Sequence, residues 1–248
     1  MIDQLISYLF SFVAALIALT VHEYCHGYAA YKLGDNTAKS LGRLTLNPIK
    51  HLDPFGALCM ILFHFGWAKP VPINPRNFRN PKRDFAITAL AGPLSNILLA
   101  FFSSFLYLLL QALFKNTVFE SKFIYTVVSN LLLFIYLFHV INIGIGIFNL
   151  IPVPPLDGSR ILNVVLPPKA YFGIMKYERK IYLGLVLWLV FGTYAANAML
   201  SIPIVRSSAV LSFFAGLLSL SNTLSTIFEA VSNLMMNFWK LIPFLNLR

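Results

Sequence analysis

The residues best suited to chemistry are His22, Glu23 and His26, which form a His-Glu-x-x-His segment. On a helix, side chains four positions apart lie on one face, so the two histidines can offer their imidazoles to a single metal ion. Glu23 lies about 100° around the helix from His22, because each turn holds about 3.6 residues. The glutamate can therefore act beside the ion without being a ligand. This arrangement predicts metal-assisted hydrolysis with a general base.

The same residues also allow a plain structural interpretation. The two histidines could cap the end of a helix, while Glu23 pairs with a surface cation. Cys25 points away from His26 on the helix, and the role of a buried, inert thiol suits it better than that of a ligand. The rest of the chain bears on this choice, because a catalytic zinc ion takes a third protein ligand.

Apolar residues dominate the composition: 58% of the 248 residues are hydrophobic and only 11% are charged. Soluble domains carry about 25% charged residues, so we expect an integral membrane protein. The net charge of +10 is better explained by membrane topology than by nucleic acid, since no compact basic domain carries it. Cys25 and Cys59 are the only cysteines, which excludes a disulfide framework and a thiolate zinc cluster.

Long apolar runs predict a polytopic α-helical membrane protein with about five spanning helices. These runs are 5–33, 84–114, 123–150, 181–200 and 210–234, of which the last could instead lie partly in the interface. The first run continues into His22 without a cleavage site, so we expect a retained helix rather than a signal peptide. The apolar stretch 55–68 is too short to cross about 30 Å of hydrocarbon and is expected to be re-entrant. A proline-rich loop is expected at 151–169.

We expect a single membrane-embedded domain over 1–248, because no segment is long and polar enough to form a separate soluble domain. Its catalytic core covers about 5–165, and C-terminal helices follow at about 181–238.

The distribution of basic residues tests this topology. If 55–68 is re-entrant, 16 of the 19 Lys and Arg residues fall on one side of the membrane and only Lys115, Lys122 and Arg206 on the other. The positive-inside rule then places the N-terminus outside and the His-Glu-x-x-His segment near the cytoplasmic face. If 55–68 spans instead, the later helices invert and this asymmetry disappears.

Asp157 is the strongest candidate for the third ligand. The other candidates are His51, His64, His139, Asp53 and Asp84. Prolines 152, 154 and 155 interrupt the helix that ends near Leu150, and Asp157-Gly158 is typical of a tight turn. The cytoplasmic ends of the first and third spanning helices lie at one depth, so Asp157 can meet the two histidines there. The plain alternative is an ordinary turn residue.

Polar residues also form stripes on two spanning helices. The stripes are Gly92, Asn96, Ser103 and Tyr107 on the second helix and His139, Asn142, Gly146 and Asn149 on the third. Such stripes usually face the interior of a bundle, where they supply hydrogen bonds between helices. Asn96 and Asn149 lie near the cytoplasmic ends, so we expect these two beside the zinc site.

Four segments of the chain resemble the signature motifs of the site-2 protease family of intramembrane zinc metalloproteases. They are His22-Glu23-Tyr24-Cys25-His26, His51-Leu52-Asp53-Pro54-Phe55-Gly56, Gly92-Pro93-Leu94-Ser95-Asn96 and Asn149…Pro152…Leu156-Asp157-Gly158. The resemblance covers about residues 5–165. It is closest to the compact subgroup without a PDZ domain, since no segment could hold one.

The resemblance implies one catalytic Zn²⁺ ion, with His22, His26 and Asp157 as ligands and Glu23 as the general base. It implies that Asn96 and Asn149 bind the substrate or stabilise the oxyanion. It further implies that the region 37–83 forms a small membrane-embedded β element, able to pair with an unwound substrate strand.

The function expected from these features is zinc-dependent endopeptidase activity inside the membrane. The expected partners are transmembrane proteins or peptides as substrates and the lipid bilayer, with no nucleic acid. The expected location is the bacterial inner membrane, with several passes and the active site toward the cytoplasm. Two alternatives are a metal-binding membrane transporter and an inactive protease-like scaffold. Transporters commonly show internal repeats or paired broken helices, and the sequence shows neither.

Overall fold

The computed structural model describes residues 2–63, 66–202, 208 and 220–245, and the elements in these residues are helical. The α-helices are α1 (Ile2–Lys32), α2 (Thr37–Ser40), α3 (Pro48–His51), α4 (Pro54–Phe63), α5 (Pro81–Phe114), α6 (Lys122–Leu150), α7 (Asp157–Val165), α8 (Pro168–Met175), α9 (Glu178–Leu200) and α12 (Leu220–Trp239). Two short 3₁₀ helices are η1 (Pro75–Asn77) and η2 (Pro243–Leu245).

Three helices of the described part, α1, α5 and α6, are long and apolar enough to cross a membrane. The shortest of them has 29 residues, which is roughly 44 Å of helix against about 30 Å of hydrocarbon. The chain is therefore a helical membrane protein. The helices predicted at 5–33, 84–114 and 123–150 are confirmed, with bounds that differ by at most three residues.

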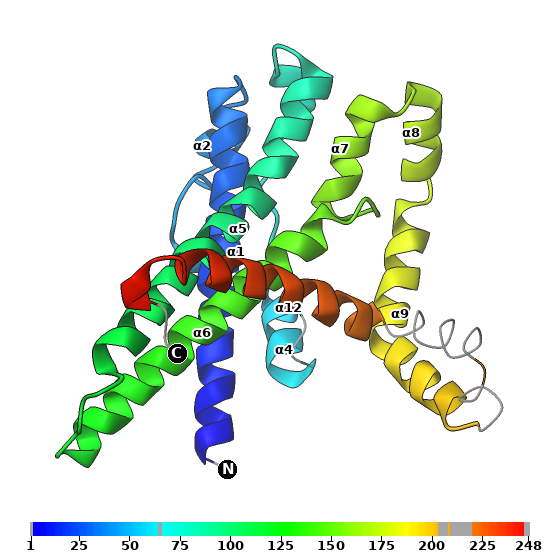
Figure 1. The fold of residues 1–248 in the computed structure, drawn as a ribbon. Coiled ribbons are helices and arrows are strands. Elements are labelled where there is room, and N and C mark those ends of the chain that lie inside the picture. Colours follow the sequence, from blue (N-terminus) through cyan, green and yellow to red (C-terminus); the bar gives the residue numbers. More distant parts are fainter. Residues whose placement is uncertain (1, 64–65, 203–207, 209–219, 246–248) are drawn as a thin grey trace.

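These three helices form the centre of the molecule. Figure 1 shows α1 running beside α5 and α6, with α12 laid across the pair. Helices α1, α5 and α6 pack against one another, and α12 packs against α5 and α6. A Cβ atom added at Gly146 of α6 would lie 3.0 Å from the side chain of Ile97 and 3.1 Å from the carbonyl of Pro93. A small residue at this position thus lets α5 and α6 approach closely, as expected for packed membrane helices.

The structure supports three of the five predicted spanning helices. Helix α9 covers the predicted run 181–200, but among the described helices only α1, α5 and α6 are long and apolar enough to count as spans. The predicted run 210–234 lies partly outside the described residues, and α12 covers the remainder and continues to Trp239.

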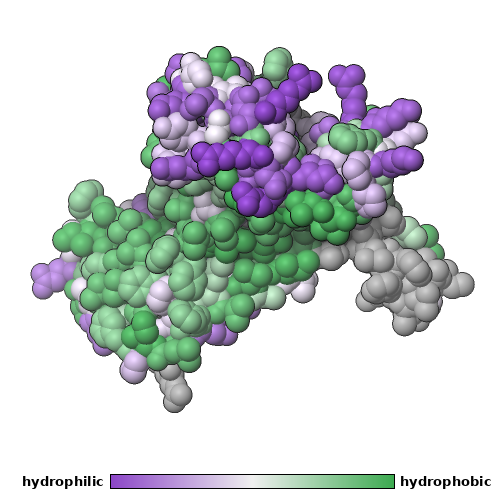
Figure 2. All heavy atoms as spheres, turned by 90° about the horizontal axis from the view of Figure 1, so that it is seen from above, coloured by the Kyte–Doolittle hydropathy of each residue, from purple (hydrophilic) through white to green (hydrophobic). Residues whose placement is uncertain are grey.

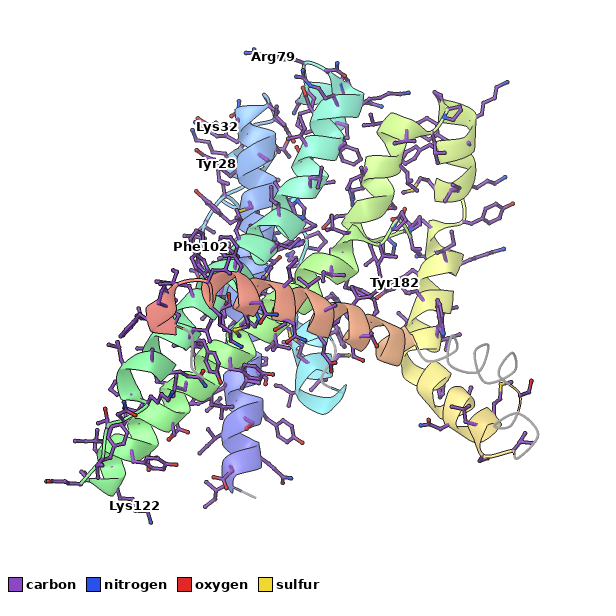
Figure 3. The ribbon with its side chains drawn as sticks, viewed as in Figure 1. Tyr28, Lys32, Arg79, Phe102, Lys122 and Tyr182 are labelled. Atoms are coloured by element: carbon purple, nitrogen blue, oxygen red, sulfur yellow. The ribbon has the colours of Figure 1, made fainter. Side chains whose placement is uncertain are left out.

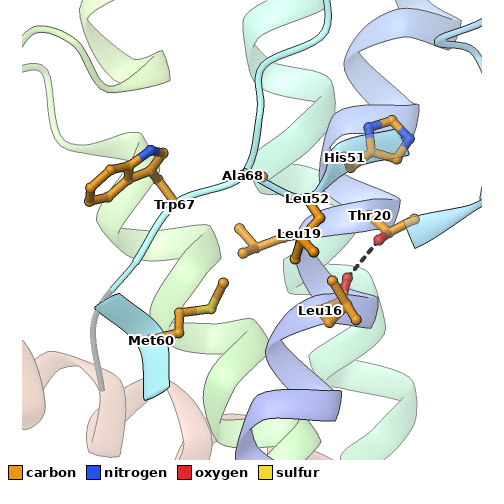
Figure 4. Close-up of a pocket in the computed structure, with 8 residues that line it drawn as sticks. All are labelled: Leu16, Leu19, Thr20, His51, Leu52, Met60, Trp67 and Ala68. Atoms are coloured by element: carbon orange, nitrogen blue, oxygen red, sulfur yellow. Dashed lines mark hydrogen bonds between the residues drawn. The ribbon is translucent and has the colours of Figure 1, made fainter. Parts of the chain in front are cut away.

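The region 37–83 does not form the predicted β element within the described residues. It folds into α2, α3, α4 and η1, joined by irregular segments and one isolated antiparallel bridge between Leu52 and Ala68. Proline is frequent here, and because it has no backbone N–H it cannot continue a strand ladder. Figure 4 shows the bridge pair beside Leu16 and Leu19 of α1, so this region packs along the first helix.

Three Asn-Pro pairs stand at the starts of helices. The side chain of Asn80 accepts the backbone N–H of Arg83 at the start of α5, while Pro81 occupies the first turn. Asn47 and Asn74 cap α3 and η1 in the same way. Proline suits a helix start because its missing N–H would have no partner there.

The segment expected to be re-entrant contains α4, which has ten residues. Its length is roughly 15 Å, too short to cross the hydrocarbon layer. Figure 1 shows α4 beside the bundle rather than beyond its ends.

The predicted loop 151–169 is wrong for most of its length. Only residues 151–156 form an irregular break after α6, and α7 and α8 follow. The prolines at 152, 154 and 155 end α6 as expected, but the next nine residues form an amphipathic helix that packs against α5 and α6. Its apolar side chains recur at helical spacing, and this periodicity prevails over the prolines beside it.

Basic side chains mark the two ends of the bundle differently. Lys32 and Arg79 lie at the end that carries α2 and the start of α5, whereas Lys122 lies at the opposite end with the N-terminus (Figures 1 and 3). Seen from the first of these ends, hydrophilic residues gather over one part of the surface, and hydrophobic residues cover most of the part beside it (Figure 2).

Candidate metal centre

The two histidines of the His-Glu-x-x-His segment face each other on α1. The helix is continuous from Ile2 to Lys32, so His22 and His26 lie one turn apart on one face. Their ring centroids are 4.6 Å apart and their Nε2 atoms 3.0 Å apart. Both residues are buried, with 4% and 5% of their surface exposed.

Asp157 completes a triangle with these histidines. Its Oδ2 atom lies 3.1 Å from the Nε2 atom of His22 and 3.1 Å from that of His26. These residues form the group of possible metal ligands in the described part of the chain, with donor atoms within 4.8 Å of one another. The break after α6 therefore returns the carboxylate to α1, as the sequence predicted.

Gly158 lets α7 begin at this place. A Cβ atom at Gly158 would lie 2.3 Å from the carbonyl oxygen of Leu150 and 2.5 Å from that of Ile151. Backbone atoms cannot yield as flexible side chains do, so only glycine allows the start of α7 to lie this close to the end of α6. The position of the Asp157 carboxylate depends on this close approach.

The outer nitrogen atoms of both imidazoles are held by acceptors. The Nδ1 atom of His26 lies 2.7 Å from the carbonyl oxygen of Thr88, which can only accept, so Nδ1 carries the proton. The Nδ1 atom of His22 lies 2.6 Å from Oδ1 of Asn96, whose amide nitrogen donates to Ala18 and Asn142. The Nε2 atoms then bear lone pairs that face the carboxylate of Asp157.

Three acceptor atoms without a proton between them repel one another unless a cation lies among them. With zinc–ligand distances of about 2.0–2.1 Å and tetrahedral angles, neighbouring donors lie about 3.3 Å apart. The observed sides of 3.0, 3.1 and 3.1 Å come close to this value. Two imidazoles and one carboxylate are also a donor set that catalytic zinc uses. The residues therefore fit a zinc ion.

Gly92 of α5 makes room for both imidazoles. A Cβ atom at this position would lie 2.3 Å from Nε2 of His26 and 2.8 Å from Cε1 of His22. No side chain fits there without moving the rings. Sequence reasoning placed Gly92 in a polar stripe but did not identify this contact.

Glu23 stands beside the triangle without belonging to it. Its Oε2 atom accepts the backbone N–H of Val71 at 2.7 Å. Glu23, His22, His26 and Asp157 all line one open cavity of about 1890 Å³. Residues from α4–α7, α9 and α12 also line the cavity, which exceeds the 300–1,000 Å³ usual for small-molecule pockets. A peptide segment would fit it.

The two asparagines predicted near the site lie in different surroundings. Asn96 is fully buried, and its side chain contacts His22, Ala18 and Asn142 rather than the cavity. Asn149 lines the cavity, and its amide donates to the carbonyl of Ile145 at 3.0 Å. Asn142, in the polar stripe on α6, accepts a hydrogen bond from Asn96. The sequence analysis did not single out Asn142 for a role at the site.

The other candidate ligands in the described residues form hydrogen bonds elsewhere, away from the triangle. His51 contacts the carbonyl of Thr45, and His139 contacts Ala100 and Ser232. Asp53 accepts the N–H of Gly56, and Asp84 accepts bonds from Asn80 and Arg83. His64 lies outside the described residues.

A helix-borne pair of histidines with a neighbouring glutamate and a distant carboxylate, set among membrane-length helices, defines the class of membrane metallopeptidases. The family model of Peptidase family M50 matches residues 10–191, a range that contains Glu23 and all three residues of the triangle. The chain belongs to this family, the one to which the site-2 proteases belong. It is therefore a zinc metalloprotease by family.

Three relatives carry names of the same kind. The chain is 42% identical over 156 residues to "Putative zinc metalloprotease YwhC" of Bacillus subtilis, covering 63% of this chain and 68% of that protein. It is 29% identical over 161 residues to "Putative zinc metalloprotease Rip2" of Mycolicibacterium smegmatis, covering 62% and 56%. It is 26% identical over 191 residues to "Zinc metalloprotease MJ0392" of Methanocaldococcus jannaschii, covering 76% and 44%. No solved structure matches the chain.

Proposed function

We propose that the chain is a zinc-dependent intramembrane endopeptidase that cuts transmembrane segments of other membrane proteins. The observation that carries the proposal is the triangle of His22, His26 and Asp157, with sides of 3.0–3.1 Å. Membership in peptidase family M50 supports the reaction class. All three proposed ligands are contributed by one domain, which we take to comprise residues 1–248.

The depth of the site supports cleavage within the membrane. His22 precedes the end of α1 at Lys32 by ten residues, which corresponds to roughly 15 Å along the helix axis. The triangle therefore lies within the membrane-length helix α1, at the end of its apolar run. We infer that a peptide bond that reaches it is cut near the cytoplasmic face of the membrane layer.

The proposed roles follow from where each side chain lies. When bound by the triangle, one zinc ion would supply Lewis-acid chemistry toward water and the scissile carbonyl. Glu23 accepts the proton of the attacking water and passes it to the leaving amine. Asn96 and the carbonyl of Thr88 fix the rings of His22 and His26. Asn149 is the cavity-lining asparagine available to the substrate carbonyl.

The substrate must present an extended backbone. A helical transmembrane segment hides its peptide bonds, so it has to unwind before it reaches the site. The isolated bridge between Leu52 and Ala68 would lie at the edge against which an unwound segment pairs. This is the place at which we locate the proposed β pairing.

The basic residues support an orientation in the bacterial inner membrane with the site toward the cytoplasm. The end that carries Lys32 and Arg79 holds the residues that the positive-inside rule assigns to the cytoplasm (Figure 3). The start of α7, with Asp157, follows the end of α6 toward the same side.

Mapping the cut sites tests this function. The purified chain in liposomes is incubated with a mixture of membrane proteins, and new peptide termini are identified by mass spectrometry. We expect termini inside apolar segments, on their cytoplasmic side, and only with zinc present. Termini confined to water-soluble loops would contradict intramembrane cleavage, and zinc flux into the liposomes without cleavage would favour a transporter.

A further inference from the structure

We propose that the backbone amide of Val71 positions the carboxylate of Glu23, and that residues 69–74, here called the strap, are built to hold this amide in place. Val71 is a positioning residue, because it acts through Glu23. The inference rests on the proposed function, in which Glu23 is the general base.

The contact itself is short and charge-assisted. The N–H of Val71 donates to Oε2 of Glu23 at 2.7 Å, the lower end of the range for hydrogen bonds to carboxylates. Within the described residues, this is the hydrogen bond that the Glu23 carboxylate accepts. Glutamate has three rotatable side-chain bonds, so an anchored Oε2 restricts the carboxylate to few positions, and Oε1 remains for proton transfer.

The sequence of the strap isolates this single donor. Val71 stands between Pro70 and Pro72, and proline has no backbone N–H. Val71 therefore provides the only amide between Lys69 and Ile73. Residues that precede proline are restricted to extended conformations, and both Lys69 and Val71 precede a proline. The local sequence thus fixes the direction of one N–H.

Hydrogen bonds tie down both ends of the strap. At its start, the N–H of Lys69 donates to the carbonyl of His51 at 2.8 Å, and Arg43 donates to the carbonyl of Lys69 at 2.8 Å. At its end, the N–H of Asn74 donates to Oδ2 of Asp35 at 2.7 Å. Asp35 is fully buried just after the end of α1, so the strap is fixed to the helix that carries Glu23.

A glycine on α1 accommodates the side chain of Val71. Gly27 lies four residues after Glu23, hence on the same face. A Cβ atom at Gly27 would lie 3.1 Å from Cγ1 of Val71, and Val71 is only 6% exposed. The close approach that glycine allows here brings the amide within reach of Glu23.

Amide hydrogen exchange tests the contact without any measure of activity. The full chain is labelled with ¹⁵N-valine in micelles, and the Val71 signal is assigned as the one lost in Val71→Ala. We expect the Val71 amide to exchange at least about tenfold faster in Glu23→Ala, because the charged acceptor is gone. Glu178→Ala removes another carboxylate that lines the cavity and should leave the signal unchanged. An unchanged rate in Glu23→Ala would overturn the inference.

Cleavage kinetics test the consequence. Val71→Pro removes the N–H, whereas Val71→Ala keeps it and trims the side chain. We expect Val71→Pro to lower kcat by about 10–100-fold with KM within about threefold and zinc content unchanged, because a misplaced catalytic group costs up to about a hundredfold. Val71→Ala should stay within about threefold of the wild type in kcat.

Two kinetic results would overturn the inference: a kcat in Val71→Pro equal to that of the wild type, or a loss of zinc together with activity, which would mean that the amide supports the ligands rather than Glu23. The two proposals fail separately. If the wild type cleaves nothing, the proposed function fails, while the exchange rate in Glu23→Ala still decides whether Val71 holds Glu23.

Discussion

Replacing Gly92 with alanine should destroy the metal centre while leaving the helix intact. The added Cβ atom would lie 2.3 Å from Nε2 of His26, 2.5 Å from its Cε1 and 2.8 Å from Cε1 of His22. Ordinary carbon contacts begin at about 3.5 Å, so the rings would have to move by roughly 1 Å. The atom nearest to the added Cβ is Nε2 of His26, which is itself a proposed ligand atom and cannot move without leaving the triangle.

The expected magnitude is large. Changes in groups that only orient metal ligands cost about 10–100-fold in metal affinity, and a displaced ligand costs at least as much as the upper value. We therefore expect the Kd for zinc to rise at least about a hundredfold, or about 2.7 kcal/mol. In a helix interior, alanine is more favourable than glycine by about 0.5–1 kcal/mol, so the fold of α5 should not suffer from the backbone change.

The assay is competition for zinc between the purified chain and a chromophoric chelator, with circular dichroism to monitor helix content. Gly184→Ala is the matched control, because Gly184 also lies in a long helix and an added Cβ atom meets nothing within 4 Å. Gly184→Ala should bind zinc as the wild type does. Wild-type zinc affinity in Gly92→Ala would refute the proposed metal centre, since the rings could not then both be ligands in the observed geometry.

Two further outcomes follow from the groups around the site. Asn96→Ala should raise the Kd for zinc by about 10–100-fold, because His22 loses the acceptor that orients its ring; an unchanged Kd would show that Asn96 has no such role. Burial alone would raise the pKa of Asp35, but hydrogen bonds from Thr37, Asn74 and Asn77 hold it below its ordinary value. A depressed folded-state pKa adds stability above the unfolded value of about 3.9 and loses it as the pH falls through the folded value. Between about pH 6 and 2, the unfolding temperature of Asp35→Asn should therefore fall less steeply than that of the wild type. An identical slope in the two proteins would contradict this role.

The sequence sufficed for the parts of the site that depend on local periodicity. Hydropathy located α1, α5 and α6, since apolar length is the dominant requirement for crossing a membrane. The spacing of His22 and His26 placed both rings on one face, because any continuous helix enforces it. Charge distribution then brought Asp157 to the same depth, although nothing local to Asp157 indicated its partner.

The parts that the sequence missed depend on contacts between distant segments. Gly92 leaves room for the rings of His22 and His26, but a glycine in a helical sequence does not indicate which side chains occupy the space beside it. The Val71 amide is a backbone group, so its acceptor cannot be read from side-chain types, although the prolines beside it mark an unusual segment. The β element expected from the resemblance at 37–83 was wrong for the described residues because prolines and asparagine caps favour short helices there.

The most direct test of the proposed chemistry compares the wild type with Glu23→Gln in liposomes that contain a transmembrane peptide substrate, with zinc content measured in both proteins. Glu23 is not part of the triangle, so zinc content should be one ion per chain in each. General acid–base groups contribute about 10²–10⁴-fold, so cleavage by Glu23→Gln should fall at least about a hundredfold. Cleavage at the wild-type rate by a zinc-loaded Glu23→Gln chain would contradict the proposed mechanism.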